Sequence, residues 1–242
     1  MRFFYIVCCV LLMGSGAWGK TRIFTDTKGR SIEAELEKFE ESSSTVTIKK
    51  AGSRQSMRVP LSLFSEKDQA YIRDWGRLQA LHDSRFDIDI SKSSKRNADK
   101  SFGTYASTEV VYDHCYNLSF ENGTKCNLEN MDLEYVIYYE QDHHLNGGYN
   151  KAVTKNGTMY VKDTISVPAR DVVEISTEKV PLVEWKTATI AQIKSDIEGI
   201  RIRLTLRADG GAETTREFSY PSKLKYAWTD QTESAFSRRA KR

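Results

Sequence analysis

Few residues in this chain of 242 are of a type and spacing that could carry chemistry. His143 and His144 follow Asp142, and imidazole nitrogens are frequent metal ligands. A metal site needs three or four converging ligands, whereas neighbouring residues of a strand face opposite sides. We therefore expect no metal or other cofactor. His143 and His144 are the candidate ligands if a site exists; a loop would have to bring both inward, with His114 or Asp142 assisting.

Catalytic motifs are missing from the sequence. There is no nucleophile elbow, no HExxH helix and no phosphate-binding glycine loop. The carboxylates are spread along predicted strands, so no pair suggests acid–base catalysis. The sequence predicts a protein that is not an enzyme. The catalytic alternative is a metal-dependent enzyme whose site is built from the loop around His143.

Two cysteines, Cys115 and Cys126, follow the first 19 residues. A turn near Asn122 would place Cys126 opposite Phe120. At about 3.3 Å per residue, Cys115 would then lie about 15 Å away, beyond the roughly 7 Å that a disulfide spans. A bent strand or a long loop would still allow the bridge, so both a disulfide and two buried thiols remain open.

Residues 1–19 have the layout of a secretory signal peptide. Arg2 precedes the apolar run 3–13, and Ala17 and Gly19 mark a cleavage site before Lys20. An uncleaved anchor is the alternative. No second apolar segment of membrane length follows, so we expect no membrane span after cleavage. The expected location is the periplasm, the cell envelope or the extracellular space.

The charge balance argues against a nucleic-acid-binding protein. The net charge at pH 7 is only +3, and no strongly basic face is evident. The last residues, from Ser237, read SRRAKR and form a local basic cluster. We expect residues 229–242 to be a disordered tail.

Residues 20–82 have the pattern of a small β-rich domain. Apolar and charged residues alternate strictly over residues 31–37, and weaker alternation recurs over 45–50 and 57–61. A turn is expected around Gly29. Ser65 begins a predicted helix, with Asp68 three residues later as an acidic form of the capping box. The apolar stripe of this helix (Ile72, Trp75, Leu78 and Leu81) is expected to pack against the sheet.

Three segments of this domain resemble the Sla homology domain (SHD), a module of a yeast endocytic adaptor. They read RIFTDTKGRSIEAELEKF, TVTIKKAG and RVPLSLFSEKDQAYI, about a quarter of the chain. Similar modules occur in exported proteins of planctomycetes and verrucomicrobia. The chain departs from the family at Phe24, where a tryptophan is usual.

The resemblance implies an SH3-like barrel that recognises a short peptide through an aromatic side chain and a carboxylate. Lys49 and Lys50 match the basic patch of the family, and Arg58 on the next strand could assist. The alternative is that all three are ordinary surface residues. The yeast ligand itself does not transfer, because a shared fold does not imply a shared function.

The polar stretch 83–104 reads as a linker with at most one short strand. Residues 105–228 then contain about seven short strands separated by turns, including turns at Gly123 and at Gly210. This spacing predicts an immunoglobulin-like antiparallel β-sandwich. The expected architecture is therefore mainly β: an SH3-like barrel with one C-terminal helix, a polar linker and a sandwich.

Arg201, Arg203 and Arg207 alternate along one predicted strand. They could form a site for an anionic ligand, or pair with Glu213 and Glu217 across the hairpin, and we favour the pairing.

Together these features predict a non-catalytic exported adaptor that binds a protein or peptide partner of unknown identity. The alternative is a structural component of the cell envelope that associates with itself through open strand edges.

Overall fold

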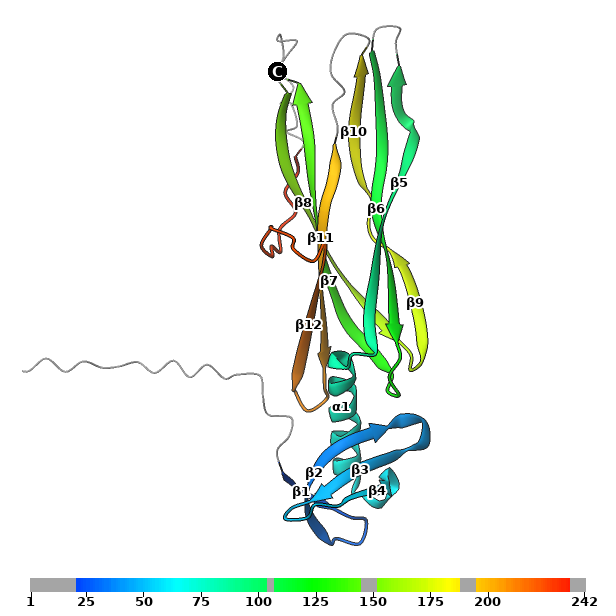
Figure 1. Ribbon diagram of the computed structural model, residues 1–242, viewed down its shortest axis with the longest axis vertical. Helices are drawn as coiled ribbons and strands as arrows, with labels where there is room; N and C mark the ends of the chain where they lie inside the picture. Colours follow the sequence, from blue (N-terminus) through cyan, green and yellow to red (C-terminus); the bar gives the residue numbers. More distant parts are fainter. Residues whose placement is uncertain (1–20, 104–106, 145–151, 188–194, 236–242) are drawn as a thin grey trace, which may run out of the picture. The chain divides into compact units, whose positions relative to one another are not determined.

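The computed structural model describes residues 21–103, 107–144, 152–187 and 195–235 (Figure 1). The expected signal peptide and the cluster from Ser237 lie outside these residues. Among the described residues the chain is mainly β, with twelve strands and one α-helix. It divides into two compact units, the amino-terminal unit (1–75) and the carboxy-terminal unit (76–242).

The amino-terminal unit contains one antiparallel sheet in the order β1-β2-β3-β4. The alternation in the sequence decides which side of this sheet is buried: Ala34, Leu36, Val46 and Ile48 lie on the inner face and are almost fully buried. The four strands are β1 (Arg22–Thr25), β2 (Ser31–Glu40), β3 (Thr45–Lys50) and β4 (Ser56–Pro60). The 3₁₀ turns η1 (Glu41–Ser43) and η2 (Leu61–Leu63) flank β3 and β4.

The expected barrel is not closed by a continuous ladder. Instead, the segment after η2 returns to β1 through a single bridge between Phe64 and Asp26. Two backbone hydrogen bonds make up this bridge: Ser65 N–H donates to Thr25 O (2.7 Å) and Thr27 N–H to Leu63 O (3.0 Å). The small domain is thus a curved sheet closed only by this short return segment.

The helix α1 (Glu66–His82) begins where the sequence predicts. Asp68 N–H donates to Ser65 Oγ (3.3 Å), and the Ser65 hydroxyl donates to Asp68 Oδ2 (3.0 Å). All four residues of the predicted apolar stripe are buried. The boundary between the two units lies between Trp75 and Gly76, within α1, whereas the sequence suggested a boundary after residue 82.

The prediction of a linker over 83–104 is wrong for most of its length. Residues Phe86–Gly103 form the strand β5, which pairs with β6 (Ser107–Asn122). Phe86 and Ile88 face inward and are buried. The polar composition of this segment is that of an edge strand with one solvent-exposed face, and not that of an unstructured connection.

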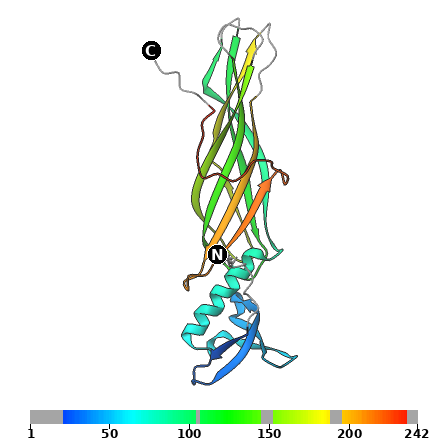
Figure 2. The ribbon, with the colours of Figure 1, turned by 90° about the vertical axis from the view of Figure 1, so that its left-hand side faces the viewer.

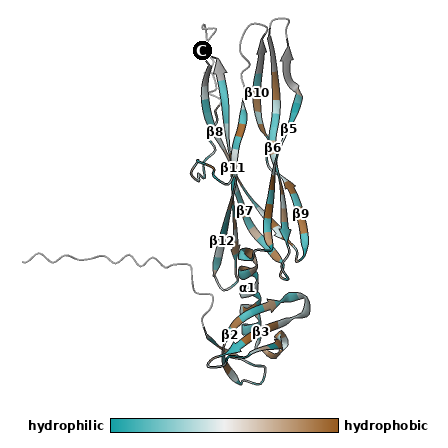
Figure 3. Cartoon of the chain, viewed as in Figure 1, coloured by the Kyte–Doolittle hydropathy of each residue, from teal (hydrophilic) through white to brown (hydrophobic). Residues whose placement is uncertain are grey.

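Two antiparallel sheets build the carboxy-terminal unit. The first, the β6 sheet, combines β5 and β6 with β9 (Asp171–Ser176) and β10 (Val180–Thr187). The second, the β7 sheet, has the order β12-β11-β7-β8. Its strands are β7 (Leu128–His144), β8 (Ala152–Val167), β11 (Asp196–Arg207) and β12 (Glu213–Tyr220). Hydrophobic and hydrophilic positions succeed one another along these strands (Figure 3), as expected for a sandwich.

β9 and β10 behave as two halves of one strand. β5 occupies one edge of β6, so both must lie along the other edge, where β10 pairs with residues 107–114 and β9 with residues 117–122. Thr177 bridges the interruption, since its hydroxyl accepts from Tyr116 N–H (2.9 Å). The strand order is then three facing four, as in immunoglobulin-like sandwiches, and the predicted sandwich is confirmed.

Cys115 and Cys126 are free thiols, so of the two alternatives left open by the sequence the disulfide does not form. Cys126 is buried and Cys115 is partly exposed. Asn122, fully buried between them, donates to Cys126 O and Val167 O (both 3.0 Å) and so fixes the connection from β6 to β7.

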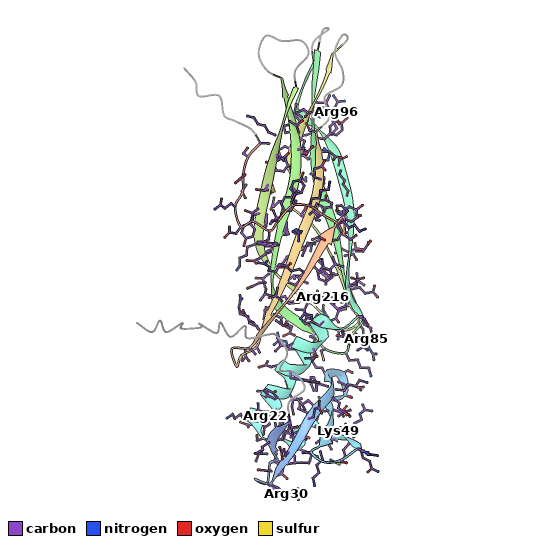
Figure 4. All side chains as sticks on the ribbon, turned by 60° about the vertical axis from the view of Figure 1, so that its left-hand side comes forward. Arg22, Arg30, Lys49, Arg85, Arg96 and Arg216 are labelled. Carbon is purple, nitrogen blue, oxygen red and sulfur yellow. The ribbon has the colours of Figure 1, made fainter. Side chains whose placement is uncertain are left out.

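Arg216 of β12 holds the end of α1 within the carboxy-terminal unit (Figure 4). Its Nη1 donates to Leu81 O (2.9 Å), Asp83 O (3.1 Å) and Phe86 O (2.8 Å). The guanidinium also lies 4.8 Å from the centre of the Phe218 ring. A helix end leaves its last carbonyls without partners. Arg216 supplies a donor to one of them, Leu81 O, and to the carbonyls of Asp83 and Phe86, which follow the helix.

We expect Arg216→Ala to lower the free energy of unfolding of the carboxy-terminal unit by about 2–4 kcal/mol, because half-buried carbonyls would lose their donor. Urea unfolding measures the change. Arg96→Ala is the matched control, since Arg96 is exposed and has no hydrogen bond or ion pair among the described residues. Equal effects of the two substitutions would contradict the role of Arg216.

Candidate functional site

The structure separates the two lysines of the expected basic patch. Lys49 lies opposite Glu35 of β2 and Ser56 of β4, whereas Lys50 lies opposite the buried Ala34. Because successive residues of β3 face opposite sides, the two side chains leave the sheet in opposite directions. Lys49 is half-buried on the outer face (labelled in Figure 4), and Lys50 is exposed.

Arg58 shares the outer face with Lys49. It pairs with Thr47 in the β3–β4 ladder, which makes it the diagonal neighbour of Lys49, about 7–8 Å away between Cα atoms. Its guanidinium is engaged with Glu40 (2.9 Å) and with Thr45 Oγ1 (3.1 Å). Exposed ion pairs of this kind contribute only about 0–1 kcal/mol, so an acidic ligand could compete for Arg58.

Lys49 has no such partner. It forms no ion pair within the part of the chain that the structure describes, although Glu35 lies across from it. The same outer face carries Ile23, which is 63% exposed and lies opposite Glu33. The outer face therefore combines an unpaired cation, an exposed apolar residue and two carboxylates, and it is not a uniformly basic patch.

Phe24, the position at which the chain departs from the SHD pattern, belongs to the core. It is 1% exposed and packs edge-on against Phe64, with ring centres 5.8 Å apart. Phe24 therefore contributes to the packing beneath the sheet and not to the outer face.

A polar cluster that sequence reasoning missed joins β1 to α1. Asp68, 5% exposed, accepts from Arg22 Nη2 (3.1 Å) and from Thr25 N–H (2.8 Å) in addition to Ser65. The Arg22 guanidinium also lies 3.8 Å from the centre of the Tyr71 ring. The capping pattern around Ser65 identified Asp68, but its ion pair with a residue 46 positions away left no local signal.

The histidines proposed as metal ligands lie at the end of β7. His143 and His144 pair with Val153 and Ala152 of β8, and their side chains lie outside the described part of the chain. Elsewhere in residues 21–235, wherever the structure describes them, no three His, Cys, Asp or Glu side chains are grouped to hold a metal ion. No helix in the described segments is long and apolar enough to span a membrane.

An open, polar hollow of about 530 Å³ lies on the outer face of the β6 sheet. Asp89, Asn117, Glu174 and Ser176 contribute to its lining. The hydroxyl of Ser176 donates to Asn117 Oδ1 (2.8 Å), so part of its polar surface is already satisfied. Among the described residues, no serine hydroxyl that lines the hollow donates to a carboxylate or imidazole base, the pairing that would activate it as a nucleophile.

His114 is a buried titratable group between the two sheets. It is 7% exposed, and neither ring nitrogen has a hydrogen-bond partner among the described residues. Its Nδ1 lies 3.8 Å from Asp196 Oδ1, and Asp196 is itself paired with Lys92 (2.5 Å). Burial lowers the pKa of His114. Lys92 acts in the same direction, while Asp196, Glu184 and Asp113 oppose the shift.

We expect Asp68→Asn to lower the free energy of unfolding by about 1–3 kcal/mol, because Arg22 would lose its charged partner. Thermal and urea unfolding measure the loss. Asp74→Asn on the same helix is the control, since the Asp74 carboxylate has no hydrogen bond to a described residue. A loss no larger than that of the control would show that the ion pair does not stabilise the domain.

We also expect the carboxy-terminal unit to lose stability as the pH falls from 7 to 5. Because its pKa is lowered, native His114 takes up a proton at a lower pH than the unfolded chain, which does so near the ordinary histidine pKa of about 6.5. The slope from this group is at most about 1.4 kcal/mol per pH unit.

His114→Leu should reduce this slope in a series of unfolding measurements. The slope of a His82→Asn variant is measured for comparison. Burial also lowers the pKa of His82, so this variant shows how much of the slope a second histidine of the same unit contributes. An unchanged slope in His114→Leu would assign the acid sensitivity to other groups.

Comparison with known proteins does not identify a family. No protein-family model and no curated protein matches the chain. A solved structure of a Northeast Structural Genomics Consortium target, SoR45, is 13% identical with a TM-score of 0.24, over 59% of this chain and 93% of that one. A crystal structure assigned to an ApaA protein of Bordetella pertussis is 13% identical with a TM-score of 0.23, over 55% and 92%. Likeness at this level adds nothing to the fold or the site.

Proposed function

We propose that the protein is an exported, non-catalytic adaptor whose residues 20–82 bind a short peptide segment of a partner protein. The observation that carries this proposal is Lys49. It lies half-buried on the outer face of β3 without an ion pair among the described residues, at a position that the SHD resemblance assigns to ligand binding.

The surroundings of Lys49 suit a ligand with one carboxylate and one apolar side chain. A carboxylate that meets a partly buried cation gains about 1.5–3 kcal/mol from a charge-assisted hydrogen bond. Exposed Ile23 on the same face offers an apolar contact, and Arg58 can release Glu40 to assist. Glu33 and Glu35 on this face disfavour a strongly acidic peptide.

Two contacts hold the elements behind this face in place, and this favours recognition. The Arg22–Asp68 pair and the bridge from Asp26 to Phe64 fix β1 against α1 and against the return segment. A preformed surface loses less conformational entropy on binding than a flexible one. Lys50, which leaves the other side of the sheet, is not part of the proposed contact.

Self-association, the alternative function, is favoured by a separate observation in the carboxy-terminal unit. Residues 221–235 lie as an extended segment over the β7 sheet, and a segment of this kind can be exchanged between copies.

A titration of the full chain with peptides of the form Phe-x-Asp, followed by NMR, tests the peptide-binding proposal. We expect Lys49→Glu to weaken binding about tenfold or more, and Lys50→Glu to change it by less than about threefold, because only Lys49 lies on the outer face. Phe-x-Lys peptides are the matched negative probe.

A pull-down from cell-envelope extract extends the test to natural partners. The wild-type chain should enrich at least one protein that the Lys49→Glu variant does not. Equal binding of both peptide series, or chemical-shift changes confined to residues outside β1–β4, would exclude the outer face as the binding site.

A further inference from the structure

After β12 the chain leaves the sheet and crosses it. Residues 221–235, here called the strap, begin with a turn in which Leu224 N–H donates to Pro221 O (3.0 Å). The strap then passes over the outer face of the β7 sheet, where its dark red trace crosses the strands (Figure 2). It ends beside β8, where Glu233 and Thr158 form an isolated β-bridge. The prediction of a disordered tail from residue 229 is therefore wrong for residues 229–235, and the rest of that tail lies outside the described residues.

The strap has the two-residue period of an extended chain. Leu224, Tyr226 and Trp228 are half-buried, whereas Lys223, Lys225 and Ala227 between them are exposed. Alternate residues therefore face the sheet, as they would in a strand.

Each of the three inward residues has a matching position on the sheet. Gly199 of β11 makes room for Leu224, since a Cβ there would lie 2.3 Å from Leu224 Cδ1. The ring of Tyr226 stacks on Tyr138 of β7, with centres 4.9 Å apart and planes 9° apart.

Trp228 is held from two sides. The Arg203 guanidinium lies 4.0 Å from its ring, and Tyr160 of β8 packs edge-on at 6.3 Å. Arg203 also pairs with Glu217 (2.7 Å) and Arg207 pairs with Glu213 (3.2 Å), so the predicted cross-hairpin pairing is confirmed for these two arginines. Arg201 lies opposite Ser219 instead.

Other contacts go to the strap backbone. Arg201 donates to Tyr226 O (2.7 Å) and Leu224 O (3.2 Å), and the Tyr138 hydroxyl donates to Ala227 O (2.6 Å). Thr158 and Glu233 exchange two backbone bonds of 2.8 and 3.0 Å. Backbone bonds supply affinity and side-chain positions supply selectivity, which is how sheet surfaces recognise extended peptides.

We propose that the outer face of the β7 sheet is a binding site for an extended Leu-x-Tyr-x-Trp segment, and that the strap of a second copy of this chain occupies it by exchange. The complementarity to residues 224–228 is observed directly, and a second copy carries the same residues. The site lies in the carboxy-terminal unit and does not depend on the peptide-binding role of residues 20–82.

The connection before the strap favours exchange. One hydrogen bond closes the turn at Pro221, and a short hinge that opens lets the segment continue away from its own sheet. An exchanged two-fold dimer repeats each strap contact twice, so no new interface is required. The strap of the same copy competes at a high effective concentration, so the dimer should grow with protein concentration.

Native mass spectrometry and sedimentation of the full chain test the exchange. The strap variant combines Tyr226→Ala with Trp228→Ala, and the face variant is Arg201→Ala. We expect wild-type dimer to increase over about a hundredfold range of concentration, and each variant alone to dimerise within about threefold of wild type, because the closed monomer and the exchanged dimer lose the same strap contacts. A mixture of ¹⁵N-labelled face variant and unlabelled strap variant should form several-fold more heterodimer than either variant forms homodimer, because one intact strap then meets one intact face, which neither variant achieves alone.

Arg207→Ala is the matched control, since Arg207 lies on the same strand face but contacts Asp132 and Glu213 instead of the strap. If the face variant does not fold, a second measurement that does not need it still tests the proposal. A fluorescent peptide of residues 222–235 should bind the strap variant about tenfold more tightly than wild type, because the face is then open. Wild type that stays monomeric, a mixture of the two variants that forms no more heterodimer than either variant forms homodimer, or equal peptide binding to both proteins would overturn the proposal.

Discussion

Successive residues of a β-strand face opposite sides, and most of this structure depends on that constraint. It selects Val46 and Ile48 for the core of the amino-terminal unit and places Lys49 outside it. It also separates Lys49 from Lys50, although the two are neighbours in sequence. The ladders then decide which outward residues meet, as when Arg203 lies opposite Glu217. Surfaces in this protein are therefore combinations of alternate residues from paired strands, not runs of sequence.

The sequence predicted the fold where alternation was regular. Residues 31–37, the strand around Ile202 and the helix start at Ser65 could all be recognised, because each carries its signal within a few residues. The stretch 83–104 could not. β5 is an edge strand whose outer face is exposed to solvent. Beyond Ile90 its inward positions are also polar, as at Lys92, which pairs with Asp196 of the other sheet. Composition therefore resembled a linker, and only pairing with β6 reveals the strand.

The sequence predicted less of the candidate sites than of the fold. Resemblance selected Lys49, Lys50 and Arg58, but it could not show which lysine faces outward or that Arg58 already holds Glu40. The strap did carry a local signal, the alternation of Leu224, Tyr226 and Trp228 with exposed residues. Three apolar positions at the end of a domain are too few to separate a strand from a tail. Its partner positions, Gly199 and Tyr138, lie far away in sequence, so complementarity appears only in three dimensions.

The hydrogen bonds of a β-ladder cannot hold a segment that has no strand partner. In this protein, arginine side chains hold such segments. Arg22 stacks on Tyr71 and binds Asp68 at the start of α1. Arg216 stacks on Phe218 and donates to three carbonyls at the end of that helix. Arg201 binds strap carbonyls while Arg203 stacks on Trp228. A planar guanidinium can cover a ring and donate several bonds at once, which a lysine ammonium cannot do. Arginine side chains and a few backbone hydrogen bonds hold the strap against the sheet. It has a defined position, but it can separate from the sheet without breaking a strand ladder.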